Sequence, residues 1–126
     1  MIFGIGTDAV SIERAGRLNG RALTKIFNPR ELEEYKSLEN AHPEIKAQFL
    51  ASRFAVKEAY AKARGLGFGS EISPSEICTC KDKDGKPFIE LSGHTLEKSP
   101  ALICHVSITH EMPLAIAFVV LETVES

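Results

Sequence analysis

The chain has 126 residues, of which 44% are hydrophobic and 25% charged, values typical of one globular domain rather than a disordered chain. Its 15 basic and 17 acidic residues give a formal net charge of −2, which argues against a general nucleic-acid-binding surface. No apolar run approaches the roughly 18 residues of a membrane helix, no signal peptide is recognisable, and three cysteines without framework spacing favour a reducing cytoplasm.

The first segment predicts a strand followed by a short helix. Residues 2–7 are apolar and contain two glycines, as in a buried strand, and we expect this strand to end at Asp8. Ser11 is a good N-cap residue for the helix that follows it. The Asn19-Gly20 pair is expected to end that helix, because both residue types favour the backbone conformation of a C-cap.

Two further helices come next. The Asn-Pro-Arg-Glu sequence of residues 28–31 supplies an N-cap, a first-turn proline and a capping-box glutamate, so we expect a helix to about residue 38. The longest helical segment covers residues 43–64, from its first-turn proline to Gly65 beyond its end. Apolar residues recur on two faces of this segment, which predicts a largely buried, central helix.

The second half of the chain changes to strand periodicity. Residues 77–81 and 87–91 flank an Asp-Lys-Asp-Gly turn sequence and predict a hairpin. Residues 102–108 and 114–121 are β-rich and predict another. Helices early and hairpins late indicate an α+β fold in a single domain, residues 1–126, with the long central helix packed on an antiparallel sheet.

The central helix contains a charged pair among apolar residues. Glu58 and Lys62 are four residues apart and therefore share one face. Alanines and Phe54 surround Glu58, and a carboxylate in such surroundings is costly unless it is paired or binds a metal. The pattern fits either a plain helix ion pair or a functional site. If Asp8 lay nearby, the two carboxylates would suit Mg²⁺, which prefers oxygen ligands and often binds substrate phosphates.

The last hairpin and the glycines after the long helix give weaker signals. His105 and Ser107 point to the same side of a strand, where the histidine is either structural or a donor to phosphate oxygens. No carboxylate pattern near them supports a Ser-His-Asp triad. The glycine-rich residues 65–69 are either a C-cap or a phosphate contact, without a P-loop ending. The cysteines lack zinc-site spacing, and their role stays open: Cys78, Cys80 and Cys104.

Charge is unevenly distributed along the chain. Residues 1–30 contain five basic and two acidic residues, whereas residues 31–44 contain one basic and five acidic ones. Three arginines follow at helical intervals, with an apolar residue between them: Arg14, Arg17, Leu18 and Arg21. They form either a solvated face or a docking patch for an acidic partner helix, with the leucine as its anchor.

Three segments together resemble the holo-acyl-carrier-protein synthases. Residues 4–14, with Gly-Ile-Gly-Thr-Asp, are similar to the N-terminal motif of that family. Residues 53–65, with a Phe-Ala-x-Lys-Glu-Ala core, are similar to its central helix, and residues 105–110 to its third motif. The order, spacing and chain length agree, so the resemblance covers essentially the whole chain. Two features depart slightly from the family pattern. Thr7 precedes Asp8 at a position where an apolar residue is also common in the family. The compact connection of residues 92–101 leaves room for a short helix or none.

The resemblance implies a 4'-phosphopantetheinyl transferase fold and a specific reaction. Such an enzyme transfers 4'-phosphopantetheine from coenzyme A to a serine of apo acyl carrier protein and releases adenosine 3',5'-bisphosphate. The implied setting is fatty acid biosynthesis in the cytoplasm. The implied assembly is a Mg²⁺-dependent homotrimer with active sites between subunits.

The same resemblance implies roles for individual residues. Asp8 and Glu58 would be the metal ligands, and Glu58 and Lys62 the catalytic residues. The coenzyme A contacts would come from Lys62, Arg53, Gly65, His105 and Thr109. The carrier protein would dock on Arg14, Arg17, Leu18 and Arg21.

Three alternatives stay open at the level of the sequence. The proton of the acceptor serine goes to Glu58, to a metal-bound water or to a group of the partner. The substrate is a fatty-acid carrier or the carrier of a polyketide or peptide synthetase. A non-catalytic module that binds coenzyme A or an acidic helix is the alternative from another class.

Overall fold

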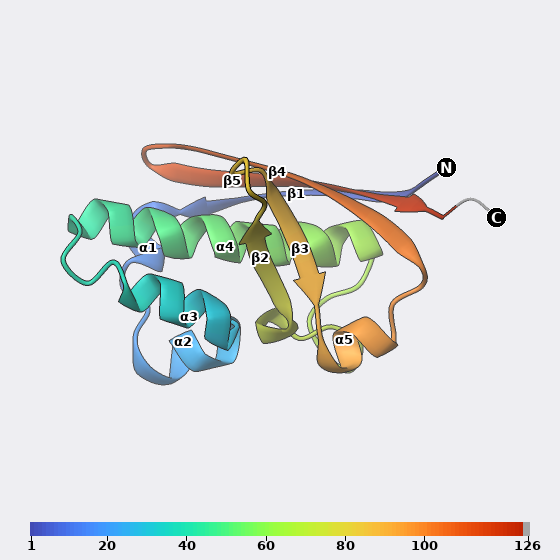
Figure 1. Ribbon diagram of the computed structural model, residues 1–126, viewed down its shortest axis with the longest axis horizontal. Coiled ribbons are helices and arrows are strands. Elements are labelled where there is room, and N and C mark those ends of the chain that lie inside the picture. Colours follow the sequence, from blue (N-terminus) through green and yellow to red (C-terminus); the bar gives the residue numbers. More distant parts are fainter. Residues whose placement is uncertain (125–126) are drawn as a thin grey trace.

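The computed structural model describes residues 1–124. Its long helix α4 (Pro43–Arg64) lies against a three-stranded antiparallel sheet of strand order β1-β5-β4 (Figure 1). The strands of this sheet are β1 (Ile2–Ser11), β4 (Leu102–Glu111) and β5 (Leu114–Thr123). A second, two-stranded sheet consists of β2 (Ile77–Lys81) and β3 (Pro87–Leu91). The short helices are α1 (Ile12–Ala15), α2 (Gly20–Ile26), α3 (Pro29–Lys36), the 3₁₀ turn η1 (Pro74–Glu76) and α5 (Gly93–Glu97).

These elements confirm the α+β prediction and most of its bounds. Helix α4 and the β2–β3 hairpin begin and end where the sequence predicts, and Gly65 closes α4 in the left-handed region at φ 76°. Strand β1 differs, because it continues past Asp8 to Ser11. Residues 8–11 pair with β5, so Asp8 lies inside a strand rather than at its end.

The prediction for residues 12–26 was wrong at one point. The Asn19-Gly20 pair starts a helix instead of ending one. The first helix already ends at Ala15, and Asn19 is the N-cap of α2, whose first residue, Gly20, has φ 51°. A glycine with positive φ suits either side of a helix boundary, and the sequence alone does not tell the two apart.

The inner face of the main sheet packs directly on α4. From β5 it contributes four fully buried side chains: Ala115, Ala117, Val119 and Leu121. From β1 it contributes two glycines, and a methyl group at Gly4 or Gly6 would overlap with the backbone of Ala63 or Ala59. The absence of side chains at these two positions therefore lets β1 touch the helix.

The outer face of the same sheet is bare and exposes several large apolar side chains beside polar ones. Five large hydrophobic side chains on it are between 37% and 59% exposed: Phe3, Ile5, Ile103, Ile116 and Phe118. They occupy alternating positions of all three strands, so they point away from α4. Several exposed large apolar side chains on one sheet face are typical of an interaction site.

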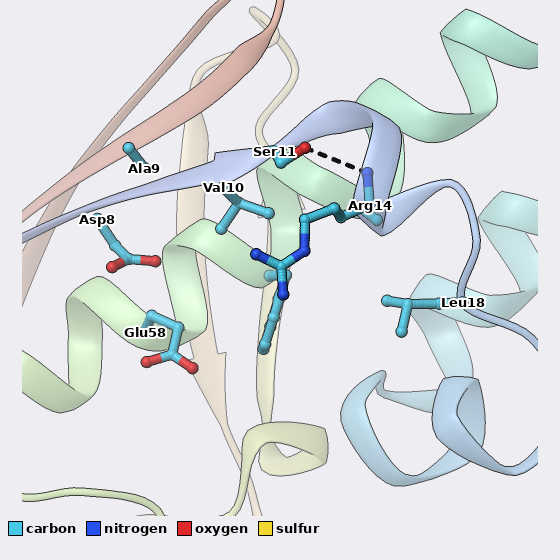
Figure 2. Close-up of a pocket in the computed structure, with 9 residues that line it drawn as sticks. Asp8, Ala9, Val10, Ser11, Arg14, Leu18 and Glu58 are labelled. Atoms are coloured by element: carbon cyan, nitrogen blue, oxygen red, sulfur yellow. Dashed lines mark hydrogen bonds between the residues drawn. The ribbon is translucent and has the colours of Figure 1, made fainter.

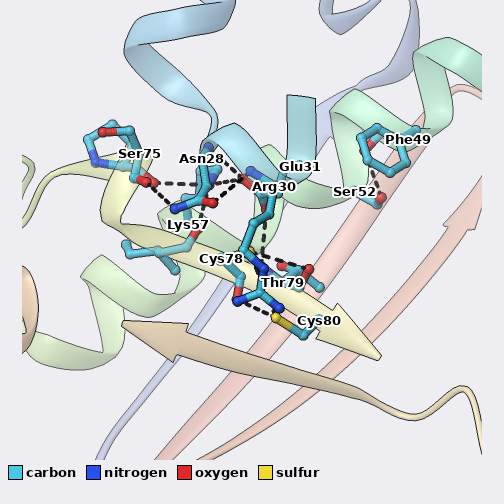
Figure 3. Close-up of polar contacts among 12 residues, drawn as sticks. Asn28, Arg30, Glu31, Phe49, Ser52, Lys57, Ser75, Cys78, Thr79 and Cys80 are labelled. Carbon is cyan, nitrogen blue, oxygen red and sulfur yellow. Dashed lines mark hydrogen bonds and ion pairs between the residues drawn. The ribbon is translucent and has the colours of Figure 1, made fainter. Parts of the chain in front are cut away.

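A buried ion pair ties the helices to the second sheet (Figure 3). Lys57 Nζ of α4 lies 2.6 Å from Glu31 Oε1 of α3, and both side chains are fully buried. The ammonium also donates to the Pro74 carbonyl at 2.9 Å, and Glu31 Oε2 accepts the Thr79 N–H at 3.1 Å. Burial lowers the pKa of Lys57, and the Glu31 carboxylate opposes this shift. The pair fixes α4 at the residue that precedes Glu58.

Candidate active site

Asp8 of β1 and Glu58 of α4 line one pocket of about 410 Å³. Figure 2 shows the Asp8 side chain extending from the strand towards α4, with the Glu58 carboxylate nearby. Residues 50 positions apart in the sequence thus meet because β1 lies directly on the helix. The expected convergence of the two carboxylates is present, while their function as metal ligands stays a prediction.

Lys62 completes a charged cluster beside this pocket. Its Nζ donates to Asp8 Oδ1 at 2.9 Å and to the Thr7 carbonyl at 3.0 Å. The hydrogen bond to Asp8 raises the pKa of Lys62, so the amine is charged at neutral pH. The Lys62 side chain is 55% exposed and flexible, and it lies one helical turn beyond Glu58.

Glu58 has the electrostatic environment of a group that gains from a bound cation. Burial raises the pKa of Glu58, the Asp8 carboxylate raises it further, and Lys62 opposes both. Among residues 1–124, no cluster of three or more histidine, cysteine or carboxylate side chains could hold a metal. Two carboxylates in an open pocket nevertheless fit Mg²⁺, which usually keeps several waters and binds through one or two carboxylates and substrate oxygens.

The predicted docking residues are only partly brought together. Arg14 and Leu18 line the pocket next to Asp8 and Glu58 (Figure 2). Arg17 instead forms an ion pair with Glu13, and Arg21 lies on α2. The helical intervals predicted that the three arginines would come together, but the stretch is broken between α1 and α2.

Arg53 belongs to a different pocket, of about 450 Å³, which is also lined by Lys81 and His110. Its guanidinium stacks on Phe49, 4.1 Å from the ring centroid, and lies 3.4 Å from Glu34 Oε2. Burial lowers the pKa of Arg53. Residues of β4 border this pocket, whereas residues of β1 border the pocket of the two carboxylates, and β5 separates those strands.

The remaining predicted coenzyme A contacts lie outside both pockets. His105 and Thr109 point from β4 to the bare outer face of the sheet, and His105 Nε2 lies 3.0 Å from Glu122 Oε1. Gly65 caps α4 and donates its N–H to the Lys62 carbonyl at 3.0 Å. Within one chain, these residues and the carboxylate pair do not form one continuous site.

Comparisons with known proteins define the class to which this fold and site belong. Residues 4–119 match the family described as the 4'-phosphopantetheinyl transferase superfamily. The chain therefore belongs to that superfamily. A holo-[acyl-carrier-protein] synthase of Bacillus subtilis is 39% identical over 129 aligned residues, covering 100% of both chains.

Two solved structures have the same fold. The holo-(acyl-carrier-protein) synthase of Bacillus anthracis in complex with CoA (3',5'-ADP) is 35% identical with a TM-score of 0.84, covering 98% of this chain and 99% of that one. The Helicobacter pylori holo-[acyl-carrier-protein] synthase in complex with coenzyme A is 32% identical with a TM-score of 0.78, covering 94% and 99%. Both cover nearly the whole chain, which confirms the predicted fold class.

Proposed function

We propose that this chain transfers the 4'-phosphopantetheine group of coenzyme A to a serine hydroxyl of apo acyl carrier protein and releases adenosine 3',5'-bisphosphate. The observation that supports this most directly is that Asp8 and Glu58 line one pocket, with Lys62 hydrogen-bonded to Asp8 beside it. The full-length similarity to holo-acyl-carrier-protein synthases, including the two solved structures that are complexes with CoA (3',5'-ADP) and coenzyme A, supports the same reaction. The proposed role is in fatty acid biosynthesis.

Asp8 and Glu58 would hold the Mg²⁺ ion. A bound ion would supply positive charge to the pyrophosphate oxygens of coenzyme A. Lys62 adds a mobile positive charge, which contacts the phosphate oxygens of coenzyme A and stabilises the leaving group. The acceptor serine belongs to the partner, so this chain needs a base and no nucleophile. The base is Glu58, a metal-bound water or a group of the carrier protein.

The carrier protein would approach over Arg14, because this residue and Leu18 border the pocket of the two carboxylates. The N-terminal 30 residues contain an excess of basic side chains, which attracts an acidic helix at long range. Arg17 and Arg21 do not line this pocket, and they contribute to the long-range attraction only. Docking at Arg14 would bring the acceptor serine close to Glu58.

The assembly proposed here is a cytoplasmic homotrimer with active sites between subunits. Its interface would cover the bare outer face of the main sheet. His105 and Thr109 lie on that face, and Arg53 lies at the sheet edge opposite Asp8. A coenzyme A molecule that contacts all of them would therefore need residues from more than one subunit. Three free cysteines agree with a reducing compartment.

Mass spectrometry tests the reaction directly. Apo acyl carrier protein incubated with this protein, coenzyme A and Mg²⁺ is expected to gain the mass of phosphopantetheine, and Glu58→Gln is expected to abolish the gain. Rates on a fatty-acid carrier are expected to exceed those on polyketide and peptide synthetase carriers. No mass gain on any of several carriers would contradict the enzymatic function and favour a binding module.

Mixed subunits test the shared site. Glu58→Gln and His105→Ala chains, each inactive alone, are expected to regain part of the activity when they are refolded together. Light scattering of the wild-type protein is expected to give three times the mass of one chain. Inactive mixtures at every ratio would place the complete site within a single chain.

A further inference from the structure

A second polar cluster surrounds the short helix α5, outside the pocket of Asp8 and Glu58. Ser73 immediately precedes η1, Glu76 is the last residue of that turn, and His94 belongs to α5; Figure 1 shows α5 far from α1, near the other end of α4. Ser73 Oγ lies 3.1 Å from His94 Nε2, and His94 Nδ1 lies 3.2 Å from Glu76 Oε1. The three side chains form a continuous hydroxyl–imidazole–carboxylate chain.

The order of these contacts favours one tautomer of His94. An ionised carboxylate only accepts hydrogen bonds, so the His94 nitrogen that faces Glu76 carries the hydrogen. In that tautomer, the other ring nitrogen accepts a hydrogen bond from the Ser73 hydroxyl. A hydrogen bond from the Thr95 hydroxyl is the main cause that lowers the pKa of Glu76, with His94 contributing, so the carboxylate stays ionised.

The cluster is held in place by its surroundings. Glu76 Oε1 accepts the Thr95 N–H at 3.0 Å and the Thr95 hydroxyl at 2.6 Å. The same hydroxyl oxygen accepts the Ser73 N–H at 2.9 Å, and Thr95 is fully buried. Gly93 has φ 56°, and a side chain there would overlap with the Glu76 carboxylate. Glu76 and Ser73 are thus fixed by one buried residue before any substrate arrives.

The cluster is also reachable from solvent. The His94 side chain is 40% exposed, and Ser73 is half-buried. A histidine base oriented by a carboxylate and hydrogen-bonded to a serine is the arrangement that activates hydroxyl nucleophiles in unrelated folds. The transferase reaction proposed above uses none of these side chains.

We propose that Ser73 is a nucleophile for acyl transfer from small activated carboxylic esters, with His94 as its general base and Glu76 as the residue that positions His94. Ser73 Oγ bonds to the ester carbonyl carbon while its proton passes to His94 Nε2. The bond to the leaving oxygen breaks, and that oxygen departs as an alcohol with the proton from His94. Water then cleaves the acyl-serine with His94 as base, which releases the carboxylic acid and restores Ser73.

Acetylation by p-nitrophenyl acetate tests this centre in the full-length protein. Brief incubation and peptide mapping are expected to find the acetyl group on Ser73, with release of one p-nitrophenol for each acetylation. His94→Gln is expected to slow the labelling of Ser73 on the order of 100-fold, the usual effect of a general base. Ser75→Ala removes a neighbouring serine of the same turn and is expected to leave the rate unchanged.

A fluorophosphonate provides a second reagent, since it reacts with activated serines. It is expected to modify wild-type protein at Ser73 and to leave Ser73→Ala unmodified, with circular dichroism confirming that each variant is folded. Labelling of Ser73 no faster than of Ser75, or equally fast in folded His94→Gln and wild type, would overturn the proposal. Modification confined to lysines would overturn it as well. Each result is independent of phosphopantetheine transfer.

Discussion

Gly6 of β1 lies against the carbonyl oxygen of Ala59 in α4, closer than any residue with a Cβ atom permits. This contact brings the strand that contains Asp8 onto the helix that contains Glu58. The distance between the two carboxylates therefore depends on the absence of a Cβ atom at Gly6, two residues before Asp8. The glycine thus acts as a positioning residue for the charged cluster.

Replacement of Gly6 by alanine is expected to push β1 away from α4 and to separate Asp8 from Glu58. We expect weaker binding of Mn²⁺, used as a paramagnetic substitute for Mg²⁺, and a loss of about 1–3 kcal/mol in the free energy of unfolding. Electron paramagnetic resonance and urea denaturation measure the two effects. Gly67→Ala, at a position surrounded by open space, is the matched control. Wild-type Mn²⁺ affinity in Gly6→Ala would contradict this function of the glycine.

Asp8→Ala is expected to abolish both Mg²⁺-dependent transfer and Mn²⁺ binding. The substitution removes one of two carboxylates and leaves Lys62 without its 2.9 Å partner. Initial rates over a Mg²⁺ titration measure the effect, and Asp84→Ala in the exposed β2–β3 turn serves as control. A variant with full activity and unchanged Mg²⁺ dependence would exclude Asp8 from the metal site.

Lys57→Met is expected to destabilise the protein by about 3–5 kcal/mol, because it leaves the Glu31 carboxylate buried without its counter-ion. The double variant Lys57→Met/Glu31→Leu is expected to recover part of that loss, since no unpaired charge remains. Urea denaturation of the two variants measures the difference. If the double variant were less stable than Lys57→Met, the hydrogen bonds of Glu31 to the backbone would outweigh its pairing with Lys57.

Arg14→Glu is expected to raise the KM for the carrier protein and to weaken its dependence on salt, with a smaller effect on kcat. Salt ions screen the attraction between a basic surface and an acidic helix. Removing the positive charge of Arg14 therefore removes part of the salt-sensitive attraction. Steady-state kinetics at two salt concentrations measure both effects. Lys83→Glu makes the same charge change in an exposed turn far along the chain. Equal KM values for wild type and Arg14→Glu would show that the docking surface lies elsewhere on the protein.

Two of the three thiols are expected to react slowly. Burial raises the pKa of Cys104 to about 11 and is the main cause that raises the pKa of Cys78 to about 12. Only about 0.1% of a thiol with the former value is thiolate at pH 8, and the thiolate is the reactive form. Alkylation by iodoacetamide, followed by peptide mapping, is expected to accelerate steeply from pH 8 to pH 10. Cys104 reacting at pH 8 as fast as free cysteine would contradict this shift.

Local sequence signals predicted those elements whose ends are set by neighbouring residues. Pro43 and Gly65 delimit α4, and the turn between β2 and β3 delimits both strands. Strand β1 extends to Ser11 because of pairing with β5, a partner more than 100 residues away, which no local signal reports. Helix α2 was missed because positive φ at Gly20 occurs at its start rather than at the end of α1.

The candidate site was predictable where a motif named its residues, as for Asp8 and Glu58. The pair Lys57–Glu31 was not predicted, because a lysine on a helix is usually solvated, and only the tertiary packing places it in the interior. The capping glutamate at the start of α3 was the available signal, although its second function requires α4 and β2 to lie against it. The Ser73 cluster likewise depends on α5 folding back onto η1.

The order in which the strands leave the ribosome differs from their order in the sheet. Strand β5 is synthesised after β1 and β4 but lies between them, and its Thr123 N–H donates to the Met1 carbonyl at 2.8 Å. During synthesis β1 has no sheet partner until β5 emerges, so the backbone around Asp8 is among the last parts of the nascent chain to become fixed. A premature stop codon near residue 113 would therefore disable the site while leaving Asp8, Glu58 and Lys62 in the product.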